Sequence, residues 1–161
     1  MVTLSSIVQR VTAFLPGRGQ AVMIQDKLYT QEARAKDDID DLVERFQGTT
    51  NPNNRINLMR ELVTVTKDYA TSGLLDADIK ATDKGHYLVP IFRDILKNDK
   101  DPAIRILAVS GLDHLRTLGN IKPILDDARE REGNQIVIDT IDNVFFIRNW
   151  RNPEIDPRPG L

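Results

Sequence analysis

The segment from Asp101 to Glu132 constrains the fold more strongly than any other part of this 161-residue chain. Asp101-Pro102 supplies a helix cap followed by a proline in the first turn, and apolar residues then recur at helical spacing. Gly119 marks a turn before a second helix that again has a proline near its start. One such helix–turn–helix unit cannot bury its own apolar face, so the segment predicts stacked neighbours. We therefore expect an all-α chain.

Related patterns flank this unit. NPNNRI, which starts at Asn51, matches DPAIRI, which starts at Asp101, in cap residue, proline, arginine and isoleucine. Pro90 and Pro123 align a second set of helices, and at an offset of 32 the segment from Gly133 to Arg148 resembles a further first helix. The predicted helices therefore span residues 52–71, 86–98, 101–117, 119–131 and 134–148.

The first 50 residues predict two helices that precede the repeats. Apolar residues follow helical spacing from Leu4 to Leu15, where Pro16-Gly17 ends the pattern, and again from Ala21 to Gln47. The polar stretch from Thr30 to Asp38 predicts a break in the second helix.

The pattern divides the chain into three parts. We assign residues 1–50 to an N-terminal helical extension, 51–148 to the repeats and 149–161 to an extended, proline-rich tail. Residues 72–85 form a longer connection than the repeat needs, and insertions of this kind often map to a binding face.

Composition excludes several classes of site. The chain has no cysteine, which excludes disulfides, thiolate zinc sites and cysteine nucleophiles, and only His86 and His114 carry imidazole. A net charge of -2 argues against a dedicated nucleic-acid binder. No run approaches the roughly 18 apolar residues of a membrane span, and the N-terminus has no signal-peptide pattern. We expect a soluble cytoplasmic protein.

The central unit contains Asp-Pro-x-Ile-Arg at 101–105, then Ala108, Leu112, Leu115, Gly119 and Pro-Ile-Leu at 123–125. This pattern resembles a HEAT repeat. The likeness is to the short bacterial type that also occurs in phycobilisome-lyase proteins, and it implies a short right-handed α-solenoid. In that family the first helices line the convex side and the second helices line the concave side. An aspartate and an arginine link adjacent repeats in a polar ladder.

The resemblance implies ladder roles for particular residues of this chain. Asp101 and Arg105 would be ladder residues, with Arg55 as a partial equivalent because Asn51 replaces the acid. The third repeat departs from the pattern, with Gly133 at the cap position and Val137 in place of the arginine. A capping end of the stack explains that loss.

The second helices supply the candidate binding surface. If the resemblance holds, their charged positions face the concave groove, and mixed charge suits a protein segment better than a nucleic-acid backbone. The alternative interpretation is ordinary solvated surface. The candidate protein-binding residues are Arg93, Asp94, Lys97, Lys122, Asp126 and Arg129.

Three other features have a functional and a structural interpretation. Asp76, Asp78, Asp83 and His86 suggest a metal or acid–base cluster, but their spacing fits no ligand pattern and favours a solvated loop. The acidic run between Asp37 and Glu44 favours a solvated face over a docking site for a basic partner. The aromatic residues from Phe145 to Trp150 favour closure of the core over a partner anchor.

The sequence predicts a non-enzymatic adaptor or scaffold that binds a protein partner, with no cofactor, no metal site and no catalytic residue. One alternative is a chromophore lyase of the phycobilisome type or another HEAT-fold enzyme such as an alkylpurine glycosylase, which rests on fold analogy. A second is a peripheral membrane adaptor that uses residues 1–18, where an apolar stripe accompanies Arg10 and Arg18.

Overall fold

The computed structural model describes residues 34–73 and 86–150, and every regular element in these ranges is an α-helix. This confirms the all-α fold class for the described part of the chain. The predicted helix at residues 4–15, most of the 72–85 insertion and nearly all of the tail lie outside it. The helices are residues 34–48, α3 (Pro52–Thr71), α4 (Leu88–Asn98), α5 (Pro102–His114), α6 (Lys122–Arg131) and α7 (Gln135–Arg148).

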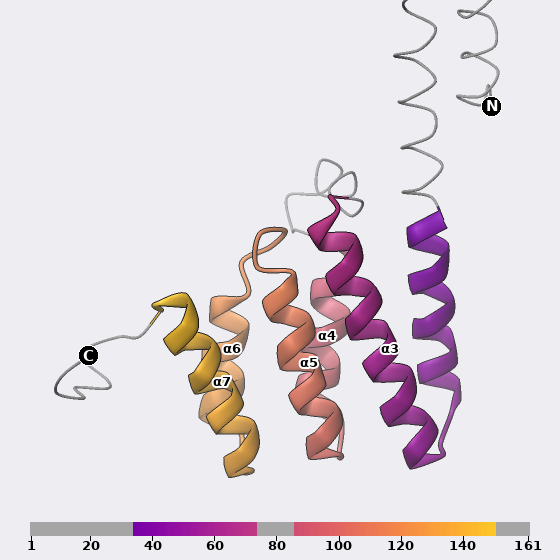
Figure 1. The fold of residues 1–161 in the computed structure, drawn as a ribbon. Helices are drawn as coiled ribbons and strands as arrows, with labels where there is room; N and C mark the ends of the chain where they lie inside the picture. Colours follow the sequence, from indigo (N-terminus) through magenta and orange to yellow (C-terminus); the bar gives the residue numbers. More distant parts are fainter. Residues whose placement is uncertain (1–33, 74–85, 151–161) are drawn as a thin grey trace, which may run out of the picture.

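The helices α3 to α7 form two rows (Figure 1). In the first row α5 lies between α3 and α7 and packs against both, while α4 and α6 lie side by side in the second row. Helix α4 also packs against α5, and α6 packs against α7. The main contacts therefore join helices that are neighbours in the two rows.

The first-row helices begin at the cap residues that the sequence indicates. Asn51 accepts a hydrogen bond from the backbone amide of Asn54 at 3.1 Å, and Asp101 accepts one from that of Ala103 at 2.9 Å. A proline follows each of these two caps, where its missing amide proton costs nothing. Local capping therefore fixes where α3 and α5 begin.

The third cap corrects the predicted alignment. Asn134, not Gly133, caps α7, because its side-chain oxygen accepts the amides of Ile136 and Val137, whereas glycine has no acceptor to offer. The repeat offset is therefore 33 residues, not 32. In this alignment Ile138 takes the arginine position, and Val137, which we expected there, is fully buried.

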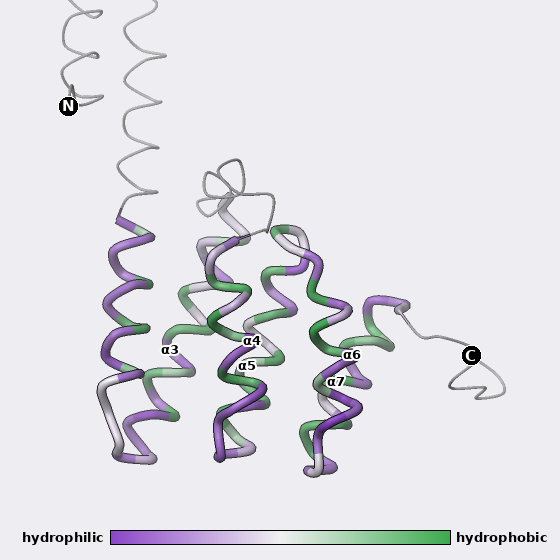
Figure 2. The backbone as a smooth tube through the Cα atoms, turned by 180° about the vertical axis from the view of Figure 1, so that it is seen from behind, coloured by the Kyte–Doolittle hydropathy of each residue, from purple (hydrophilic) through white to green (hydrophobic). Residues whose placement is uncertain are grey.

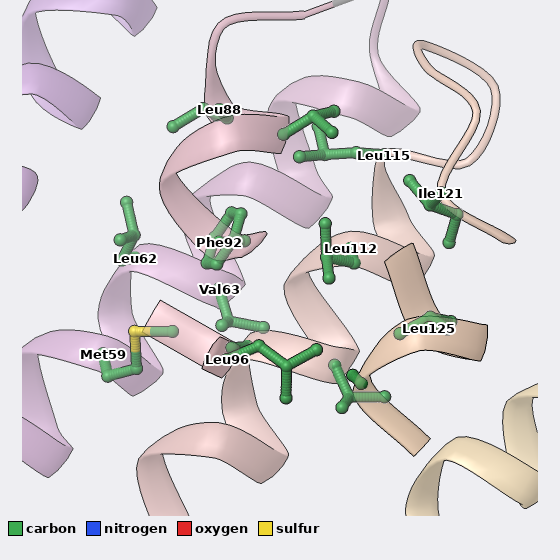
Figure 3. Close-up of a cluster of buried hydrophobic side chains, with 14 of the residues drawn as sticks. Met59, Leu62, Val63, Leu88, Phe92, Leu96, Leu112, Leu115, Ile121 and Leu125 are labelled. Atoms are coloured by element: carbon green, nitrogen blue, oxygen red, sulfur yellow. The ribbon is translucent and has the colours of Figure 1, made fainter. Parts of the chain in front are cut away.

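One continuous core lies between the two rows. Figure 3 shows part of it, with side chains of α3, α4, α5 and α6 converging, including Phe92 and Leu112, which are fully buried. Gly111 of α5 is needed here, because a Cβ atom on it would lie 2.5 Å from the Phe92 ring. The close approach of α4 to α5 therefore depends on that glycine.

Helix 34–48 belongs to the same core. Ile39, Leu42 and Phe46 are buried in the cluster that α3 to α7 form, so the predicted boundary at residue 50 does not separate two cores. The Tyr69 hydroxyl of α3 donates a 2.8 Å hydrogen bond to Asp38, which raises the pKa of Tyr69. Residues 34–38 are helical, and the remainder of the stretch in which we expected a break, residues 30–33, lies outside the described residues.

Candidate functional site

Two arginines connect successive first-row helices by donating to an acid at an equivalent position. Arg105, four residues after its cap, donates to Glu132 through Nε at 2.9 Å and Nη2 at 2.8 Å. Arg55, also four residues after its cap, donates to the carboxylate of Asp99. Each acid lies two residues before the cap of the next first-row helix, at Asp101 or Asn134. An arginine on one helix thus holds the start of the following one.

The two acids also position the next cap. Asp99 accepts the backbone amide of Asp101 at 3.0 Å, and Glu132 accepts the backbone amide of Asn134 at 3.0 Å. The two acids, like the two caps, are 33 residues apart. Two sequence signals identify these acids: their shared offset and their place two residues before a cap. The predicted repeat pattern did not include Asp99 or Glu132.

Asp101 does not take the ladder role that we predicted. Its carboxylate accepts the amide of Ala103 and so serves the start of its own helix, leaving Asp99 to bind Arg55. The reason is that the side-chain oxygen of an N-cap residue accepts an amide in the first turn of its own helix. Arg105 and Arg55 do make cross-helix bonds, but to Glu132 and Asp99.

Glu132 is the most constrained acid of this network. Its side chain is only 7% exposed and that of Arg105 is 14% exposed. Burial opposes ionisation, but the hydrogen bonds from Arg105 and from the amides of Asn134 and Gly133 outweigh it and lower the pKa of Glu132. The Arg105–Glu132 pair is therefore charged and structural near neutral pH.

A small cavity adjoins this network. It has a volume of about 170 Å³ and is lined by Leu96, Lys97, Asp99, Arg105, Ala128, Arg131 and Glu132. Pockets for small organic ligands usually measure about 300 Å³ or more. The cavity is therefore a gap between α4, α6 and the ion pairs, and it is too small to suggest a substrate.

The candidate binding residues on α4 lie on one exposed stripe. Arg93 and Asp94 form a surface pair with an Nε–Oδ1 distance of 3.2 Å, and the side chains are 51% and 62% exposed. Lys97 lies one turn further along and is also exposed. These three residues therefore lie on the surface of α4.

The candidate residues on α6 are divided between two roles. Lys122 and Asp126 form an i,i+4 pair at 2.9 Å, and the Lys122 ammonium lies 5.7 Å from the centre of the Phe145 ring. Arg129 instead binds Asp142 of α7, with 3.0 Å between Nη2 and Oδ2. Arg129 thus fastens α6 to α7, which makes it a poorer candidate for partner recognition than the others.

The two histidines lie at helix ends and are buried or partly buried. His86 is fully buried, and its Nδ1 accepts the backbone amide of Leu88 at 3.2 Å. His114 ends α5, and partial burial lowers its pKa. Asp76, Asp78 and Asp83 lie outside the described residues. Within residues 34–73 and 86–150, no group of three or more acids and histidines is placed to hold a metal ion.

The aromatic residues near the end of α7 also divide. Phe145 is buried and contacts Trp150 edge-on, with ring centres 6.5 Å apart, so these two close the core as the sequence favoured. Phe146 points outward and is 50% exposed, together with Ile136 and Ile147.

Comparison of the chain with family models, curated proteins and solved structures gave no match. The likeness to HEAT repeats therefore rests on the residues themselves. In the described ranges, none of the helices is both long enough and apolar enough to cross a membrane. Residues 1–18, on which the membrane-surface alternative depends, lie outside those ranges.

Proposed function

We propose that this chain is a short right-handed HEAT-like solenoid that acts as a non-enzymatic adaptor or scaffold for a protein partner. The observation that carries the proposal is the recurring link between first-row helices. Arg55–Asp99 and Arg105–Glu132 occupy equivalent positions relative to successive caps. Links that join only neighbours are the basis of solenoid architecture, in which each unit is stabilised by the units beside it.

The surface of α4 and α6 suits protein recognition. Its candidate contacts are Arg93, Asp94, Lys97, Lys122 and Asp126, which carry both signs of charge on two helices that lie side by side. Exposed ion pairs contribute only about 0–1 kcal/mol to stability. These residues can therefore exchange their local partners for those of a bound protein at little cost to the fold.

Affinity capture from the native cell tests the proposal with a matched pair of variants. Arg93→Glu/Lys97→Glu reverses two charges on α4, and Arg60→Glu/Lys67→Glu reverses two exposed charges on α3. We expect the wild-type chain and the α3 variant to retain the same partner, and the α4 variant to recover it about tenfold less. Failure to capture any protein, or equal capture by both variants, contradicts the proposal.

A further inference from the structure

Helix 34–48 lies beside α3, on the side of α3 that faces away from α5 (Figure 1). Residues of these two helices and of the turn that joins them line a groove. Its volume is about 780 Å³, compared with about 170 Å³ for the cavity beside the arginine–acid links. Helix 34–48, which forms one wall, is mainly hydrophilic along its length (Figure 2). The groove is lined by Asp41, Glu44, Arg45, Gly48, Thr49, Asn54, Asn57, Leu58 and Glu61.

Comparison with α5 explains why the groove is open. Counted from their caps, Asn54, Leu58 and Glu61 of α3 correspond to Ile104, Ala108 and Gly111 of α5. The three α5 residues are buried by neighbouring helices. On α3 the same stripe has Asn54 and Glu61 exposed and Leu58 partly exposed. Positions that are part of the core on α5 therefore line an open groove on α3.

The groove has a strongly acidic lining. Asp41, Glu44 and Glu61 face one cation, Arg45, whose Nη1 lies 3.6 Å from Asp41. Among the described residues, Glu44 and Glu61 form no ion pair. Leu58 is a partly exposed apolar residue of the same lining. The groove thus offers an apolar side chain and two carboxylates that form no ion pair within the described part of the chain.

We propose that this groove binds a basic amphipathic helix of a partner protein. Lysine or arginine side chains of that helix pair with Glu44 and Glu61, and an apolar side chain packs on Leu58. A helix fits better than an extended strand because α3 already receives a helix, α5, on its opposite face. The stripe from Asn54 to Glu61 is about 10 Å long, enough for roughly two turns of the bound helix.

This inference rests on the proposed binding function and adds a second surface to it. The charge complementarity also predicts a marked salt dependence, because ion pairs at an exposed groove are screened at high ionic strength. We expect the affinity of the bound helix to fall as salt increases.

The test uses the full chain and a labelled synthetic helix of leucine and lysine at helical spacing, with fluorescence anisotropy as the measurement. The groove variant is Glu44→Lys/Glu61→Lys, and the matched control is Asp127→Lys/Glu130→Lys, which makes the same charge change on exposed residues of α6. We expect about tenfold weaker binding for the groove variant and less than a twofold change for the control. Leu58→Asp should also weaken binding, while thermal unfolding shows that each variant is folded.

Three results would overturn the proposal. The first is that the wild-type chain does not bind the leucine–lysine helix. The second is equal weakening in the groove variant and the control, which would indicate general charge attraction. The third is a wild-type dimer, measured by light scattering, that the groove variant converts to a monomer, because a second copy would then be the occupant.

The α4 variant Arg93→Glu/Lys97→Glu separates this inference from the proposed function. It should bind the synthetic helix as the wild type does. If helix binding is absent while partner capture still depends on α4, only the groove proposal fails. If helix binding depends on the groove while no partner is captured by any chain, only the proposed function fails.

Discussion

Helices α3 and α5 begin in the same way but differ in what their matching faces contact. Both have a capping side chain, a proline in the first turn and an arginine four residues after the cap. On α5, the stripe that contains Gly111 packs against Phe92 of α4. On α3, the equivalent stripe, which contains Glu61, lines an open groove. The same start signals therefore place both helices, and side-chain size and polarity decide whether a face becomes core or surface.

The largest effect is expected from exchanging these two faces. Gly111→Leu forces a side chain into the space of the buried Phe92 ring and should lower the free energy of unfolding by about 3 kcal/mol or more. Glu61→Leu, at the equivalent position of α3, should change it by less than about 0.5 kcal/mol. Urea unfolding of the two variants measures the difference. Similar values for both would show that the two faces are packed alike.

The next effect compares a buried ion pair with an exposed one. Glu132→Gln removes the carboxylate charge that Arg105 faces and places an amide N–H against the guanidinium N–H groups. We therefore expect the free energy of unfolding to fall by about 2–3 kcal/mol. Asp142→Asn does the same opposite the more exposed Arg129 and should cost less than about 1 kcal/mol. Chemical denaturation monitored by circular dichroism provides both values. A loss at Asp142 as large as that at Glu132 would contradict the assigned role of burial.

The free energy of unfolding should depend on pH through the ionisation of Glu132. Its pKa is lower in the folded chain than in the unfolded one, so its contribution is complete above the ordinary glutamate pKa of about 4.3. The contribution is lost as pH falls through the lower, folded-state pKa. Unfolding free energies measured from pH 7 to pH 3 should fall more steeply for the wild type than for Glu132→Gln. Parallel curves would show that Glu132 is not stabilised as a carboxylate.

A smaller effect is expected at the helix caps. Asn134 accepts two backbone amides and Asn51 accepts one, so Asn134→Ala should cost about 1 kcal/mol and Asn51→Ala somewhat less. Thermal unfolding of the two variants compares the caps directly, with Asn53→Ala on the exposed side of α3 as a control. The reverse order would indicate that the Glu132 contact to the Asn134 amide holds α7 by itself.

Local signals in the sequence were enough to predict most of the helices. The predicted range of 52–71 is that of α3, and the caps and prolines placed the starts of α3 and α5 because capping depends on residues close in the chain. The alignment of α7 was wrong by one residue because Gly133 and Asn134 are both common at helix starts. Only the side-chain hydrogen bonds of Asn134 distinguish them.

The candidate binding residues were less predictable than the helices. Arg129 follows the same helical pattern as Lys122 and Asp126, but its contact with Asp142 depends on how α6 and α7 cross. Asp99 and Glu132 lie in short connections, and their role depends on arginines distant in the sequence. The groove beside Glu61 requires the position of helix 34–48, which the sequence suggested only as part of an extension.

The sequence by itself determined the all-α class and the positions at which α3 and α5 begin, because capping groups, prolines and helical periodicity act within a few residues. Only the tertiary structure decided that Asp99, not Asp101, binds Arg55. It also decided that Glu61 of α3 lines a groove, whereas Gly111 at the equivalent position of α5 packs against Phe92. These outcomes depend on the distance and orientation between helices. Such geometry is set by packing across the whole core, which no local pattern contains.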